Sequence, residues 1–144
     1  RSLKFMIRTH PVLSLQQLAE LSHLSIELPG NVFISSDRTV LEDIEECDAL
    51  LYWGTTVALE AIMLGKPVIH FDRGDLLSFD PLFELSDFKW MTTKEANLED
   101  IINEIRGLSD VEYCQLRDSA RAYVRDYFHP VNQENLEAFF EGIK

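Results

Sequence analysis

The chain has 144 residues, of which 46% are hydrophobic and 26% charged, values typical of one globular domain and not of a disordered segment. Its formal net charge of −12 disfavours nucleic-acid backbones and anionic membrane surfaces as partners, although a small anion can still bind at a local positive site. No apolar run approaches the roughly 20 residues that span a bilayer, and no signal peptide is visible. Cys47 and Cys114 lack metal-ligand spacing, so we expect reduced thiols, no bound metal and a cytoplasmic protein.

Short apolar strands alternate with helices over the first two thirds of the chain. The predicted strands are 3–8, 31–34, 48–52, 67–71 and 88–91, and the predicted helices between them are 14–23, 39–47 and 56–64. This alternation predicts an α/β fold with a doubly wound, mainly parallel, Rossmann-like sheet of about five strands, which binds ligands at the carboxyl ends of its strands.

Three further helices are predicted over 97–106, 110–128 and 131–143. We therefore expect a single domain over 1–144, with a helical tail over 108–144. Because the chain begins at Arg1 and a strand pattern follows at once, we expect it to be a piece of a longer protein.

Local signals mark where several helices begin and end. Ser14 and Gln17 have the spacing of a capping box, as do Thr39 and Glu42. Gly65 is typical of the left-handed residue that follows a helix. These signals set the expected helix ends.

The segment 48–60 is predicted as a strand, a tight turn and a helix, with the turn at the ligand edge of the sheet. Gly54 lets the backbone approach a ligand closely, and Thr55 and Thr56 offer hydroxyl and N–H groups to phosphate oxygens. Glu60 lies one helical turn further on the same face and suits the two hydroxyls of a ribose. A simple capped turn is the alternative. Against it, Glu60 is the single charge on an otherwise apolar helix, and burying it costs on the order of several kcal/mol unless a partner satisfies it.

The stretch 48–72 resembles the donor-binding domain of GT-B glycosyltransferases. The resemblance implies that Gly54, Thr55 and Thr56 cradle the diphosphate of a nucleotide-sugar and that Glu60 holds its ribose. It also implies a sugar transfer to an acceptor held by an N-terminal domain outside this chain, without which the piece is expected to be inactive. The nucleotide-sugar is a substrate, so we expect no separate cofactor.

A second resemblance lies at the end of the first strand. Arg8-Thr9-His10-Pro11 is similar to the Arg-x-His-Pro turn of capsule, teichoic-acid and sialic-acid transferases, which favours surface-polysaccharide or glycan assembly. Arg8 can pair with a diphosphate, and His10 can donate a hydrogen bond or move a proton. A strand-ending turn with a solvated arginine fits the residues equally well.

Other polar residues follow the second and fourth strands. The GT-B resemblance implies that Ser35 and Ser36 lie near the nucleotide base and that Asp72 and Asp75 contact the donor sugar. Ordinary solvated turns remain the alternative for both pairs. His70 lies within a strand and is expected to be a core histidine.

Two rival functions share parts of this pattern. UDP-sugar 2-epimerases have a similar fold and His-Pro turn, but they usually carry Asp-Ser-Gly-Gly where 52–55 reads Tyr-Trp-Gly-Thr. A receiver-like regulatory module needs a phosphorylatable aspartate at the end of the third strand, where Tyr52 stands. Many retaining GT-B enzymes carry a second glutamate at that same position, eight before Glu60, so its absence favours an inverting enzyme.

Overall fold

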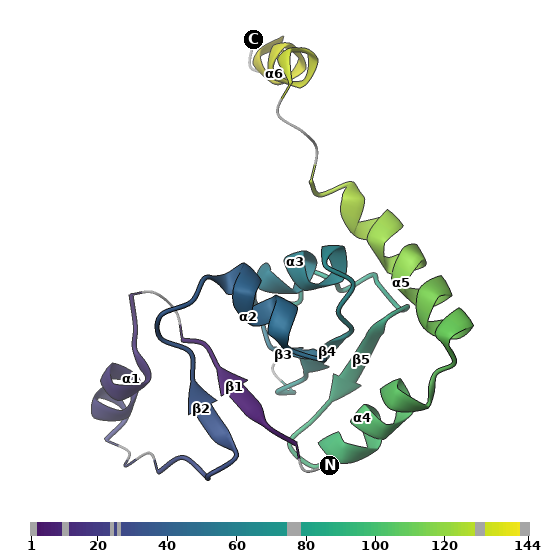
Figure 1. Cartoon of the computed structure of the whole chain (residues 1–144). Coiled ribbons are helices and arrows are strands. Elements are labelled where there is room, and N and C mark those ends of the chain that lie inside the picture. Colours follow the sequence, from purple (N-terminus) through teal and green to yellow (C-terminus); the bar gives the residue numbers. More distant parts are fainter. Residues whose placement is uncertain are drawn as a thin grey trace. The chain divides into compact units, whose positions relative to one another are not determined.

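The computed structural model describes residues 3–9, 12–23, 25, 27–74, 79–128 and 132–141 (Figure 1). The chain is a mixed α/β protein, and among the described residues the paired strands β1 to β5 run parallel. Its internal contacts divide it into two compact units, which we name unit 1 (Arg1–Glu46) and unit 2 (Cys47–Lys144). Helices and strands occur in both units in the predicted order.

The described part of unit 1 contains a two-stranded sheet and two short helices. Strand β1 (Phe5–Ile7) pairs in parallel with β2 (Val32–Ile34), and helices α1 (Leu15–Leu21) and α2 (Val40–Glu46) follow these strands in the chain. Because the two strands are parallel, both end at the same edge of the small sheet. Arg8 and Ser35 are the residues directly after these strand ends.

Both capping boxes predicted in unit 1 are present. The Ser14 hydroxyl accepts the backbone N–H of Gln17, and the Gln17 side chain accepts the backbone N–H of Ser14 at 2.8 Å. At the start of α2, Glu42 accepts the backbone N–H of Thr39 at 2.7 Å, and the Thr39 hydroxyl accepts the backbone N–H of Glu42. Each box satisfies two donors that the first turn of a helix leaves without an intrahelical partner.

Unit 2 contains a three-stranded parallel sheet in the order β3-β4-β5. The strands are β3 (Leu50–Tyr52), β4 (Val68–Phe71) and β5 (Lys89–Thr92). The helices are α3 (Val57–Met63), α4 (Leu98–Gly107), α5 (Asp110–Arg125) and α6 (Gln133–Glu141). Helices α5 and α6 occupy the segment predicted as a helical tail.

The expectation of one sheet of about five strands differs from the pairing in the structure. Five paired strands are present in the described residues, but β1 pairs with β2 in one sheet, and β3, β4 and β5 form another. Hydrophobic periodicity identifies a strand but does not specify its neighbours, because pairing depends on contacts between segments far apart in the chain. The parallel α/β class is confirmed, whereas the single doubly wound sheet is not observed.

The core of unit 2 lies between α3, β4 and α5. Strand β4 is central in its sheet, and Val68 and Ile69 are almost fully buried, as expected for a strand covered on both faces. Helix α3 packs against α5. The buried side chains that these two helices contribute are Ala58, Leu59, Ala61, Ile62, Ala120 and Val124.

A glycine turn connects α3 to β4. Gly65 has a φ of 77°, in the left-handed region predicted for it, and its N–H donates to the carbonyl of Ile62 while that of Lys66 donates to the carbonyl of Ala61. These two bonds are those of a Schellman motif. The Tyr113 hydroxyl of α5 donates to the carbonyl of Gly65 at 3.0 Å, so the turn is also anchored from outside α3.

The last helix of the described chain exposes three large apolar side chains. Leu136, Phe139 and Phe140 of α6 are 40%, 65% and 63% exposed. None of the helices in the described ranges is both long enough and apolar enough to cross a membrane.

Candidate functional site

The turn after β3 contains a glycine on which another segment packs closely. A Cβ on Gly54 would lie 3.0 Å from the Cβ of Phe79 and 3.4 Å from the Phe79 carbonyl oxygen. The segment that contains Phe79 therefore packs directly on the backbone of this turn. This close approach within the protein favours glycine at position 54, in addition to any approach of a ligand.

The two threonines of the turn have different roles. The Thr55 hydroxyl accepts the N–H of Val57 at 3.3 Å, and the Thr55 carbonyl accepts the N–H of Ala58, also at 3.3 Å. Thr56 occupies the N-cap position but makes no side-chain capping bond. Thr55 therefore stabilises the first turn of α3, while the Thr56 side chain is exposed to solvent.

Glu60 lies on the accessible side of α3. Its neighbours Leu59 and Ala61 are buried, whereas Glu60 itself is only half-buried. Within the described ranges its carboxylate has no hydrogen-bond or ion-pair partner. The prediction that Glu60 is buried on an apolar helix is therefore corrected: solvent reaches it, so folding alone does not oblige it to have a partner.

Asp72 shapes the loop after β4. Its Oδ1 accepts the backbone N–H of Gly74 at 2.8 Å, and Gly74 has a φ of 73°. This is a local turn held by an aspartate side chain, which uses part of the capacity of the carboxylate to accept hydrogen bonds. Asp75, the other residue predicted to contact a sugar, lies outside the described residues.

Three side chains that the sequence did not single out meet beside Gly54. The rings of Trp53 and Phe79 are in edge-to-face contact, with centroids 5.9 Å apart and planes at 74°. The Arg73 guanidinium carbon lies 4.3 Å from the centroid of the Trp53 ring, a cation–π contact. His70 Nε2 donates to the Trp53 carbonyl at 3.0 Å, so this predicted core histidine is indeed buried and hydrogen-bonded.

In unit 1, Arg8 and Ser35 converge on a buried aspartate of α2. Arg8 donates to Asp43 Oδ2 at 2.5 Å and to the Arg38 carbonyl at 2.9 Å, and the Ser35 hydroxyl donates to Asp43 Oδ2 at 2.7 Å. Arg38 Nε lies 3.5 Å from Asp43 Oδ1, and the Arg38 guanidinium also contacts Glu46. We name Arg8, Ser35, Arg38 and Asp43 the arginine–aspartate cluster.

This cluster keeps Asp43 ionised. Burial by itself raises the pKa of Asp43, whose exposed fraction is 5%. The hydrogen bonds from Ser35 and Arg8, together with the two arginine charges, lower it by more, so the pKa of Asp43 lies below its ordinary value. Arg8 is therefore ion-paired within unit 1, although the residue stays exposed to solvent.

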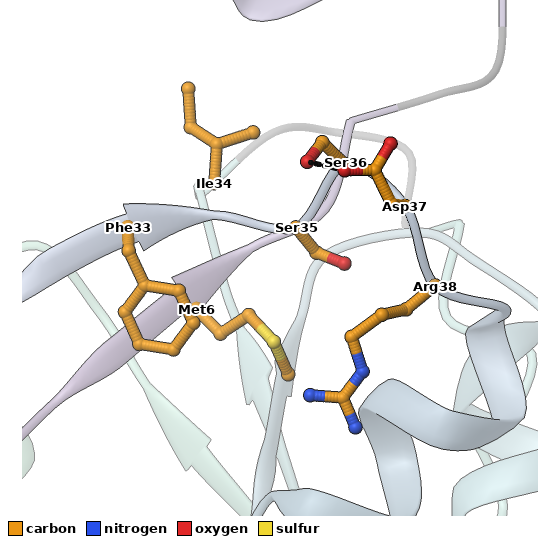
Figure 2. A pocket seen from close by; sticks show the side chains of 7 residues that line it. All are labelled: Met6, Phe33, Ile34, Ser35, Ser36, Asp37 and Arg38. Carbon is orange, nitrogen blue, oxygen red and sulfur yellow. Dashed lines mark hydrogen bonds between the residues drawn. The ribbon is translucent and has the colours of Figure 1, made fainter.

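A shallow pocket of about 210 Å³ lies at the end of β2 (Figure 2). Its lining side chains are Met6, Phe33, Ile34, Ser35, Ser36, Asp37 and Arg38. The Ser36 hydroxyl donates to Asp37 at 3.1 Å, the bond drawn as a dashed line in Figure 2. Both serines predicted near the nucleotide base thus line one pocket of unit 1, whereas His10 lies outside the described residues.

The sequence also missed a buried ion pair in unit 2. Lys89 Nζ lies 2.9 Å from Asp80 Oδ2, and the Tyr52 hydroxyl donates to Asp80 Oδ1 at 2.6 Å. Burial, followed by the bond to Asp80, raises the pKa of Tyr52 far above its ordinary value. Burial raises the pKa of Asp80 too, but the hydrogen bonds from Tyr52 and Lys89 lower it by more. Asp80 precedes the turn at 81–84, and in addition it anchors the carboxyl end of β3.

The candidate residues therefore form two groups. Arg8, Ser35 and Ser36 lie at the strand ends of unit 1, and Gly54, Thr55, Thr56, Glu60 and Asp72 lie in unit 2. Among the described residues, no group of three or more His, Cys, Asp or Glu side chains is arranged to hold a metal ion. Searches with this chain found no matching family model, no matching curated protein and no matching solved structure.

Proposed function

We propose that this chain is the nucleotide-sugar-binding domain of a GT-B glycosyltransferase that acts in surface-polysaccharide or glycan assembly. The observation that carries the proposal is the β3–turn–α3 segment of unit 2. It combines a glycine turn at the carboxyl end of a parallel strand with an accessible carboxylate one helical turn beyond it. Ligands of parallel α/β sheets bind at this edge.

Each part of the segment suits one part of a nucleotide-sugar. Gly54 keeps the turn free of a side chain, and the hydroxyls of Thr55 and Thr56 can donate to phosphate oxygens. The Thr55 hydroxyl accepts a bond from Val57 and can still donate its own hydrogen. Hydroxyl and backbone donors aimed at a diphosphate stabilise the negative charge that develops as the nucleotide departs, without a metal ion.

Glu60 is proposed to bind the ribose. Its carboxylate can accept hydrogen bonds from both ribose hydroxyls, and no partner within the described ranges competes for it. Hydrogen bonds to a charged group contribute more than bonds between neutral groups, about 1.5–3 kcal/mol each. A ribose ligand therefore gives this accessible carboxylate a function that folding does not.

Other expectations form part of the same proposal. Ser35 and Ser36 would lie near the base, Asp72 and Asp75 near the donor sugar, and Arg8 and His10 near the diphosphate. The acceptor would be held by a further domain. A single doubly wound sheet, a cytoplasmic location and an inverting reaction likewise remain predictions.

Calorimetric titration tests the donor site directly. UDP, GDP, CDP and their common sugar conjugates are titrated into the chain and into its Glu60→Ala variant, with Glu99→Ala as control. Glu99 is an exposed glutamate in the first turn of α4, so it matches the change in residue and charge. We expect Glu60→Ala to lower the affinity for the nucleotide that binds by about tenfold or more. Glu99→Ala should leave this affinity unchanged.

A nucleotide that lacks the ribose hydroxyls tests whether Glu60 binds the ribose. A 2′,3′-dideoxy form of the bound nucleotide should bind wild-type protein more weakly than the parent nucleotide, and this difference should disappear in Glu60→Ala. Nucleotide binding that is insensitive to Glu60→Ala would contradict the proposal, as would a failure of every nucleotide to bind. Formation of an epimer from a UDP-sugar by the full-length protein, without an acceptor, would favour the epimerase alternative.

A further inference from the structure

Two exposed aromatic rings meet at the carboxyl end of β3. Trp53 is 38% exposed and Phe79 is 61% exposed, and their rings touch edge to face. A soluble protein gains by burying large rings, so two that remain in contact and accessible beside a candidate site are suited to receive a ligand. We name Trp53 and Phe79 the ring pair.

The ring pair is held in place by the surrounding backbone and side chains. Phe79 packs on Gly54, where a Cβ would approach the Phe79 Cβ to 3.0 Å. The Trp53 carbonyl accepts a hydrogen bond from buried His70, and the Arg73 guanidinium covers part of the Trp53 ring. A surface ordered in this way loses little conformational freedom when a ligand binds.

The order of groups in the proposed ligand matches the order along the chain of the residues proposed to bind it. From Glu60 the chain runs back through Thr56 and Thr55 to Gly54 and then to Trp53. A nucleotide-sugar runs from ribose through diphosphate to sugar. With the ribose at Glu60 and the diphosphate at the threonines, the next group along the ligand is the glycosyl ring and the next side chain along the chain is Trp53.

We propose that the ring pair is a platform for the glycosyl ring of the donor, an inference that rests on the donor function proposed above. A pyranose presents C–H groups on its ring faces, and these polarised hydrogens pack on the electron-rich face of an aromatic ring. The 61% exposed Phe79 offers most of the contact area, and Trp53 borders it. The ligand class is a hexose with an uninterrupted C–H face, such as a gluco- or galacto-configured sugar.

Paired ligands that differ only in the sugar test the platform. The affinities of UDP and UDP-glucose, and of GDP and GDP-mannose, are measured by calorimetry for wild-type protein and for Phe79→Ala. This variant retains the Cβ that packs on Gly54. We expect Phe79→Ala to lower the affinity for the sugar conjugate by about 3- to 10-fold and to leave the affinity for the free nucleotide unchanged.

Phe139→Ala is the matched control. Phe139 is 65% exposed on α6 and also belongs to an edge-to-face pair, with Phe140, so a similar amount of exposed ring is removed outside the candidate site. It should change the affinity of neither ligand. Phe79→Tyr keeps the ring and should retain the preference for the sugar conjugate.

Tryptophan fluorescence gives a second readout with the ring pair intact. Trp90→Phe leaves Trp53 as the sole tryptophan of the chain, and Trp53→Phe leaves Trp90, whose indole N–H donates to Glu104. In the Trp90→Phe protein, the sugar conjugate should change Trp53 emission more than the free nucleotide does. In the Trp53→Phe protein the two ligands should have the same effect.

The possible results separate the platform from the donor site. In one outcome, nucleotide binding depends on Glu60, while Phe79→Ala leaves the preference for the sugar conjugate unchanged and both ligands change Trp53 emission equally. That combination would overturn the platform and leave the proposed donor function standing. An equal loss of affinity for the free nucleotide and for the conjugate in Phe79→Ala would also overturn the platform, because the ring would then act on the nucleotide or on the turn. Absence of all nucleotide binding by wild-type protein would overturn both proposals.

Discussion

Removing the charge of Asp80 tests whether the buried ion pair anchors the end of β3. Asp80 and Lys89 are both nearly inaccessible, with side-chain exposed fractions of 5% and 7%. Asp80 accepts bonds from Tyr52, from the backbone N–H of Leu82 and from Lys89. In Asp80→Asn the amide oxygen can still accept from Tyr52 and Leu82, but the buried ammonium of Lys89 loses its counter-charge.

The expected cost follows from this geometry. Breaking a buried ion pair on one side destabilises a protein by about 3–5 kcal/mol, because the remaining charge stays away from water without compensation. Lys89 also donates to the Leu82 carbonyl, which offsets part of that loss, so we expect about 3 kcal/mol for Asp80→Asn. Lys89→Met should cost a similar amount, because it leaves the Asp80 carboxylate buried.

Urea unfolding of the single and double variants provides the measurement. With a slope of about 2 kcal/mol per M, a loss of about 3 kcal/mol lowers the unfolding midpoint by about 1.5 M. The double variant Asp80→Asn/Lys89→Met should be more stable than the sum of the two losses predicts, by about 1–3 kcal/mol. A single-variant loss below about 1 kcal/mol, or strict additivity, would refute the view that these two charges depend on each other.

Two other substitutions test packing and charge. Gly54→Ala should destabilise the protein by about 1–3 kcal/mol in urea, because the new Cβ would approach the Phe79 Cβ to 3.0 Å. Gly107→Ala, whose Cβ meets no atom within 4 Å, is the control and should not be destabilising; equal behaviour of the two variants would contradict the packing argument. The lowered pKa of Asp43 gives stability that is present above about pH 4 and is lost as the pH falls through the folded-state pKa. Between pH 5 and about pH 2.5, the free energy of unfolding in urea should therefore fall less for Asp43→Asn than for wild type. If the two proteins lose stability in parallel over this range, the Asp43 carboxylate does not stabilise the fold in this way.

The order of helices and strands could be predicted from the sequence because its signals are local. Ser14 with Gln17 and Thr39 with Glu42 are three residues apart, so the chemistry that starts each helix is contained in a single turn. Gly65 ends α3 because a residue without a Cβ tolerates its left-handed conformation at little cost. The position of the Gly54 turn after an apolar strand was predictable for the same reason.

The pairing and exposure of the charged side chains depend on contacts between segments that are far apart in the chain. Arg8 lies 35 residues from Asp43, and Tyr52 lies 28 residues from Asp80, so no local pattern indicated that either pair would meet. The exposure of Glu60 depends on which face of α3 packs against α5, and the division of the strands into two sheets depends on which edges meet. The sequence by itself determined the order and approximate position of the helices, strands and turns, because their signals lie within a few residues of one another. Only the tertiary structure decided which charges are neutralised and which remain accessible, because ion pairing and burial depend on distances through space.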